Sequence, residues 1–166
     1  MIQDAWRAGS IRFRPRVIVS LLVDDGRLVK TIKFANPKYV GDPINAVKIF
    51  NEKNVDELVI YDVSATNNKK INYPLLEKIA KEARMPLCYG GYIDSGESAV
   101  SVVSLGFEKV SVSTAALLNP NLIKEISQRI GSQSTIVTLD VKDRLFKSGW
   151  SVYCSNGKKK IPISLD

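Results

Sequence analysis

Five short apolar segments alternate with four amphipathic ones along this chain, and the alternation constrains the fold more than any other feature. The apolar segments are rich in β-branched residues, which is typical of buried parallel strands. Each of the first four is followed by apolar residues at intervals of three and four, the spacing of a helix packed on a sheet. The order predicts a parallel α/β sheet. The predicted strands span residues 17–22, 58–62, 86–89, 109–112 and 135–139.

Capping residues mark the helix starts. They are Asp42-Pro43, Asn72 with Pro74, Asp94 with Glu97 at the capping-box spacing, and Asn119-Pro120. Residues 28–34 predict a short additional strand, 66–70 a polar loop and 145–163 a β-hairpin. Residues 1–14 show no clear period and carry three arginines, so we interpret them as a leader or arm and residues 15–166 as one domain.

Both a doubly wound sheet and a (β/α)8 barrel produce this pattern. A complete barrel needs about 200 to 250 residues, and this chain has 166. As a barrel it would hold only about the first five strands and four helices. Its first and fifth strands would then be unpaired edges, which favours self-association.

Composition excludes several classes of function. There is no histidine, and the two cysteines, Cys88 and Cys154, form neither a disulfide framework nor a metal-ligand spacing. We therefore expect no metal site and no cofactor. The net charge of +7 is scattered rather than clustered, so nucleic acid is not the expected partner. With no membrane-length apolar run and no secretory signal, we expect a cytoplasmic protein.

Candidate site residues follow the predicted strands, at the end of the sheet where parallel α/β proteins bind ligands. Gly90-Gly91 and Ser113-Thr114 are candidates for binding a phosphate group; a tight packing turn explains the glycines equally well. Asp62 and Asp140 are candidate acids or bases, with helix or loop capping as the alternative. Lys30 is a candidate catalytic lysine or a solvated surface residue.

Together these segments resemble one family, the cyclase subunit of imidazole glycerol phosphate synthase. The resemblance runs from about Arg16 to the end of the chain and implies part of a (β/α)8 barrel that receives ammonia from a glutaminase subunit in a heterodimer. The segments that carry it are 25–30, 41–43, 55–62, 90–91, 109–116 and 131–133.

The resemblance also implies roles for individual residues. The family's cyclase uses an aspartate on the first and on the fifth strand; Asp140 matches the fifth, whereas the first falls on Leu22, which cannot transfer a proton. Ring closure should therefore be lost or crippled. Tyr92 replaces a glycine that normally follows Gly90-Gly91, and Ser113 replaces an asparagine.

The ammonia apparatus matches better than the cyclase chemistry. Arg16, Glu57 and Lys109 fall on three of the four charged positions that gate ammonia at the amino-terminal face of the family's barrel. Glu108 falls where the family places an acidic contact to the glutaminase. Surface charges at strand starts are the alternative explanation.

A retained gate with a lost aspartate resembles the paralogues that serve surface-polysaccharide synthesis. There the barrel is thought to deliver ammonia toward an amidotransferase that makes an acetamidino sugar, so a phosphorylated or anionic sugar is the expected small molecule. Two alternatives remain: a cyclase of histidine biosynthesis, and a non-catalytic binding fragment. Residues 21–22, 28–31 and 37–46 favour the first interpretation.

Overall fold

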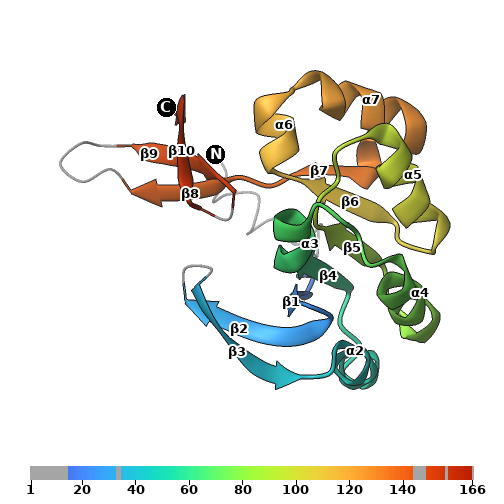
Figure 1. Ribbon diagram of the computed structural model, residues 1–166. Coiled ribbons are helices and arrows are strands. Elements are labelled where there is room, and N and C mark those ends of the chain that lie inside the picture. The colour runs from blue at the N-terminus through green and yellow to red at the C-terminus, as the bar shows by residue number, and fades with distance from the viewer. Residues whose placement is uncertain (1–14, 33–34, 144–148, 156, 166) are drawn as a thin grey trace, which may run out of the picture.

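The computed structural model describes residues 15–32, 35–143, 149–155 and 157–165, so the predicted leader, residues 1–14, lies outside the described residues. Seven strands form the main sheet, in the order β3-β2-β1-β4-β5-β6-β7 (Figure 1). Their bounds are β1 Ile18–Asp24, β2 Arg27–Ile32, β3 Ala35–Gly41, β4 Glu57–Asp62, β5 Leu87–Gly90, β6 Lys109–Val112 and β7 Thr135–Val137.

Strand order decides between the two predicted architectures. Strands β1, β4, β5, β6 and β7 are parallel, and each pairs with the next parallel strand along the chain. A doubly wound sheet reverses its order at a switch point, and this sheet does not, so the prediction of a partial (β/α)8 barrel is confirmed. The expectation that β1 is a wholly unpaired edge is wrong, because Val23 and Asp24 pair antiparallel with β2.

Helices α4, α5 and α7 line one side of the curved sheet (Figure 1). The core lies between this side and the helices, where Ile60 and Val110 of the strands belong to one cluster with Leu76, Ile79 and Ile126 of the helices. The bounds are α2 Pro43–Glu52, α3 Val63–Asn68, α4 Tyr73–Glu82, α5 Gly96–Ser104, α6 Thr114–Leu118 and α7 Asn121–Ile130, with a 3-10 turn, η1, at Ser132–Ser134.

The predicted caps of α2 and α4 are confirmed: Asp42 accepts from the backbone N–H of Asn45 at 3.0 Å and Asn72 from that of Leu75 at 3.2 Å. The predicted capping box is wrong by one residue. It joins Ser95 and Ser98, because Ser95 has the extended backbone that an N-cap needs.

Two other local predictions fail. In the loop expected at 66–70, residues 66–68 are helical, because Asp62 caps the short helix α3, and only 69–70 lie outside it. The sequence analysis also missed β3, which contains Pro37 and pairs with β2 at the sheet's outer edge. Edge strands tolerate proline because they leave one side of the ladder unpaired.

A second sheet follows the fifth parallel strand. It contains β8 Asp140–Asp143, β9 Trp150–Cys154 and β10 Lys159–Leu165. The β9–β10 hairpin was predicted; β8, which pairs with β9, was not. Because β7 ends at Val137 and β8 begins at Asp140, the predicted strand 135–139 was two residues too long.

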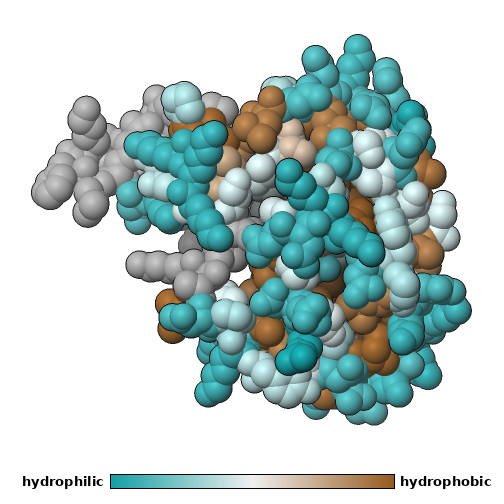
Figure 2. Space-filling view, viewed as in Figure 1, coloured by the Kyte–Doolittle hydropathy of each residue, from teal (hydrophilic) through white to brown (hydrophobic). Residues whose placement is uncertain are grey.

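The surface shown in Figure 2 is mostly hydrophilic, with hydrophobic residues reaching it over α6, where Leu118 is 66% exposed. Among the described helices, none combines the length and the apolar character needed to cross a membrane.

Candidate functional site

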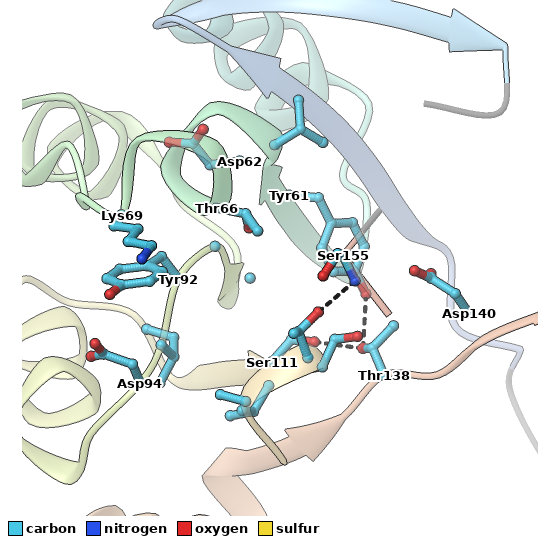
Figure 3. Close-up of a pocket in the computed structure, with 18 of the residues that line it drawn as sticks. Tyr61, Asp62, Thr66, Lys69, Tyr92, Asp94, Ser111, Thr138, Asp140 and Ser155 are labelled. Carbon is cyan, nitrogen blue, oxygen red and sulfur yellow. Dashed lines mark hydrogen bonds between the residues drawn. The ribbon is translucent and has the colours of Figure 1, made fainter. Parts of the chain in front are cut away.

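The carboxyl ends of the parallel strands surround a cavity of about 440 Å³. Figure 3 shows its polar side chains converging from β4, β6 and the segments that follow the strands. It brings together eight residues that the sequence singled out: Leu22, Asp62, Gly90, Gly91, Tyr92, Ser113, Thr114 and Asp140. They come from five successive strands or strand ends, which meet here because parallel strands present their carboxyl ends at one edge.

Two carboxylates of this pocket differ in their partners. The Oδ1 atom of Asp62 accepts from the Ala65 backbone N–H at 2.9 Å and the Ser64 hydroxyl at 2.6 Å, so the helix-capping alternative is what the structure shows. Burial raises the pKa of Asp62 despite these bonds. Burial also raises the pKa of Asp140, opposed by a backbone hydrogen bond from Gly157 and the charge of Lys142. In both residues, burial therefore favours the protonated form of the carboxyl group.

The two glycines allow close packing at the pocket wall. A Cβ atom on Gly91 would lie 2.6 Å from the Tyr89 hydroxyl oxygen and 2.9 Å from Cβ of Asp62. One on Gly90 would lie 2.7 Å from Cδ1 of Tyr61. The packing alternative therefore accounts for both glycines. Their predicted contact with a phosphate remains a prediction.

Ser113 and Thr114 begin helix α6 on the opposite wall. Ser113 makes no side-chain capping bond. The Thr114 hydroxyl oxygen accepts from the backbone N–H of Ser155 at 2.9 Å, which ties the end of β9 to the pocket (Figure 3). The small sheet thereby covers one side of the pocket mouth.

Tyr92 lies among the charged residues that line the pocket. Tyr92 adopts φ +48°, the left-handed region that favours glycine, and Figure 3 shows its ring between Lys69 and Asp94. The nearby Asp94 carboxylate raises the pKa of Tyr92. Of the described lining residues, Asp62, Asp94 and Asp140 are acidic and Lys69 is basic, a balance that disfavours a multiply charged anion.

The described residues hold no group of three histidine, cysteine, aspartate or glutamate side chains placed for a metal ion.

A second cluster lies at the opposite, amino-terminal end of the sheet. Oε2 of Glu57 is 2.8 Å from Nη2 of Arg16 and 2.6 Å from Nζ of Lys109. The Glu57 side chain is only 3% exposed, whereas that of Arg16 is 56% and that of Lys109 22% exposed. The structure thus brings together the three residues predicted as an ammonia gate; the role itself stays a prediction.

Two predicted site residues lie elsewhere. Lys30 is exposed on β2, in register with Lys38 of β3, and does not line the pocket. This position fits the surface-lysine alternative. Glu108 is exposed just before β6, next in sequence to Lys109, so its predicted partner contact concerns the same end of the sheet as the ion cluster.

The sequence analysis missed a group of three hydroxyls on the pocket floor. The Thr138 and Ser111 hydroxyl oxygens lie 2.5 Å apart, and those of Thr138 and Tyr61 lie 3.4 Å apart. A usable signal existed: Tyr61 and Ser111 alternate with strand residues that face the helices, so a period of two places them on the opposite face.

Comparisons with known proteins agree with this geometry. The family described as "Histidine biosynthesis protein" matches residues 16–165. The chain belongs to that family. Relatives include "Putative imidazole glycerol phosphate synthase subunit hisF3" of Vibrio vulnificus, 51% identical over 89% of this chain and 57% of its own length. "Putative imidazole glycerol phosphate synthase subunit hisF2" of Pseudomonas aeruginosa is 50% identical over 91% of this chain and 60% of its own length.

"Imidazole glycerol phosphate synthase subunit HisF" of Pyrococcus furiosus is more distant, at 40% identity over 87% of this chain and 57% of its own length. The chain thus spans somewhat under two thirds of the length of these family members. Its five parallel strands correspond to that share of an eight-stranded barrel.

Proposed function

We propose that this chain is a cyclase-like barrel subunit of a glutamine amidotransferase system, which accepts ammonia from a glutaminase at the amino-terminal end of its sheet. The observation that supports this most is the buried Glu57 carboxylate held by Arg16 and Lys109. A buried carboxylate between two cations is costly to build, and this one lies beneath the pocket rather than in it. That position suits a role in the passage of ammonia better than a role in a reaction inside the pocket.

The pocket at the other end supports the same proposal. Leu22 lines it where the family resemblance implies an acid, while Asp140 is present. A pair of carboxyl groups is needed for one to donate and the other to accept a proton. We therefore expect the barrel to deliver ammonia to an acceptor enzyme. We propose that this acceptor is an amidotransferase that synthesises an acetamidino sugar for a surface polysaccharide.

The test mixes the full protein with a glutaminase subunit of the imidazole glycerol phosphate synthase type. We expect a heterodimer in size-exclusion chromatography and glutamate release above that of the glutaminase alone. Glu57→Gln should abolish the stimulation. Glu77→Gln is the matched control, because Glu77 is an exposed helix residue that pairs with the exposed Lys81. No complex and no stimulation would overturn the proposal.

A cyclase of histidine biosynthesis is the second candidate, favoured by Asp140 in the pocket and by the names of the relatives. Complementation of a histidine auxotroph that lacks the cyclase would decide for it. Leu22→Asp sharpens the result. Cyclase turnover that appears only in this variant would show that the wild type lacks activity because it lacks this carboxylate.

A further inference from the structure

Tyr61 lies across the concave face of the sheet, beneath the pocket. It projects from β4 toward Thr138, which follows β7, and Figure 3 shows the two hydroxyls joined over the strands between them. Strands β5 and β6 separate β4 from β7 in the sheet. The tyrosine side chain therefore reaches over β5 and β6 on the face turned away from the helices, and the curvature of the sheet brings Thr138 within its reach.

The strand beneath the ring is shaped to receive it. A Cβ atom on Gly90 would lie 2.7 and 2.8 Å from two carbons of the Tyr61 ring. Only a glycine lets the ring lie this flat against β5. The ring thus covers the part of the concave face that a side chain at position 90 would otherwise fill.

On β4 and β5, the side chains one layer below the ring are closed off from solvent, whereas Ser20 of β1, in register with Val59, is exposed. Val59 is 9% exposed and Cys88 1%, and below them Glu57 is 3% exposed. Val59 and Cys88 are in register with one another, as are Tyr61 and Gly90 one step closer to the pocket. Tyr61 consequently stands between the buried part of the concave face on β4 and β5, with the ion cluster at its base, and the open pocket.

We propose that Tyr61 is a shutter between this interior and the pocket, and that Thr138 is its latch. The inference rests on the proposed function, since a shutter matters only if something passes. The hydroxyl contact of 3.4 Å is long and therefore weak. The latch partner is also engaged by Ser111 at 2.5 Å, so the tyrosine can release without leaving Thr138 unpaired. A swing of the ring about its Cα–Cβ bond would open a path for a small neutral molecule such as ammonia.

Cys88 offers a built-in reporter for the test. The chain has two cysteines, so a Cys154→Ser background leaves Cys88 as the only thiol. The probe is methyl methanethiosulfonate, a small reagent, applied at one fixed pH because burial, reinforced by Glu57, raises the pKa of Cys88 to about 12. Tyr61→Phe keeps the ring and removes the hydroxyl, Thr138→Val removes the latch, and Tyr61→Ala removes the ring.

We expect labelling about twofold faster in Tyr61→Phe and Thr138→Val, the Boltzmann factor of a hydrogen bond at the weak end of the usual range, and faster still in Tyr61→Ala. Leu76→Ala is the matched control, because Leu76 is 1% exposed in the helix-side core and its loss destabilises without touching the concave face. A bulky polyethylene glycol maleimide reports global unfolding.

Acceleration confined to the small reagent, absent from Leu76→Ala, would support the shutter. Unchanged labelling in Tyr61→Ala, or equal acceleration with the bulky reagent, would overturn it. The measurement needs no glutaminase, so it separates the two proposals. Small-reagent acceleration without glutamine-dependent stimulation would leave the shutter standing and remove the conduit it was proposed to serve.

Discussion

The two ends of the parallel sheet hold buried carboxylates in opposite ways. At the amino-terminal end, Glu57 is paired with Arg16 and Lys109 through side chains that reach across neighbouring strands. At the carboxyl end, Asp62 and Asp140 meet mainly backbone N–H groups and a hydroxyl, and burial raises the pKa of each. At one end two cationic side chains hold the carboxylate, and at the other burial favours the protonated form of each carboxyl group.

The two ends of the sheet also differ in residue type: one is built from charged side chains and the other from glycines. The amino-terminal cluster is held together by long charged side chains. Substitutions that remove a charge should therefore destabilise it. The pocket wall depends on the absence of side chains at Gly90 and Gly91, so its sensitivity is steric. Substitutions at the two ends should therefore fail for different physical reasons.

The largest expected effect is that of Glu57→Gln. It leaves Lys109, which is mostly buried, without a counter-charge, and removing one partner of a buried pair costs about 3 kcal/mol. Urea unfolding measures the change. Glu77→Gln, which breaks an exposed pair, should cost almost nothing. A change at Glu57 within the surface range of about 0.5 kcal/mol would show that the cluster is not a stabilising unit.

Gly91→Ala should be the next most damaging, at about 2 kcal/mol, because its Cβ atom would overlap the Tyr89 hydroxyl and the Asp62 backbone carbonyl. Tyr89→Phe removes the nearest of these atoms. The double variant should therefore recover part of the loss in a urea unfolding cycle. Strict additivity of the two changes would show that the wall relaxes elsewhere.

These steric contacts mark the limit of what sequence could predict. The strand order and the caps at Asp42 and Asn72 were predictable, because apolar periodicity and capping chemistry are local. The convergence of Asp140 with Gly90 was predictable once the strands were taken as parallel. The Tyr61 contact with Thr138 was not, because it joins residues 77 positions apart through the curvature of the sheet.

The helix α3 shows how a small local choice escaped prediction. A polar run at 66–70 resembles a loop, yet the Asp62 side chain supplies the first turn with a partner and makes a helix of it. The same carboxyl group was considered as a catalytic candidate or as a cap, and sequence alone could not separate the two.

Substitutions of Asp62 test whether burial raises the pKa of a carboxyl group in the pocket. Asp62→Asn keeps a good N-cap, whereas Asp62→Ala loses it, so the alanine variant should be about 1 kcal/mol less stable than the asparagine variant at pH 7. Because burial raises the folded-state pKa of Asp62, the native state binds its proton more tightly than the unfolded chain. Wild-type stability should therefore fall, relative to Asp62→Asn, as pH rises above about 4.

Urea unfolding of the wild type and Asp62→Asn between pH 3 and pH 7 gives the two curves, with the pH window set by the ordinary aspartate pKa of about 4. They should converge at the acid end, where both side chains are neutral. Wild-type stability that instead rises with pH relative to Asp62→Asn would mean that the capping bonds outweigh burial. Asp62 would then resemble Glu57 in being a carboxylate held by its hydrogen-bond partners.

The smallest effect is expected at Tyr89, whose buried hydroxyl has no hydrogen-bond partner among the described residues. Tyr89→Phe removes this group and keeps the edge-on contact with Phe107, whose ring centroid is 6.1 Å away. Relieving an unpaired buried hydroxyl should stabilise the fold by about 0.7 kcal/mol. A loss of stability instead would reveal a partner for the hydroxyl beside Gly91, and the carboxyl end would then rest on polar contacts, as the amino-terminal end does.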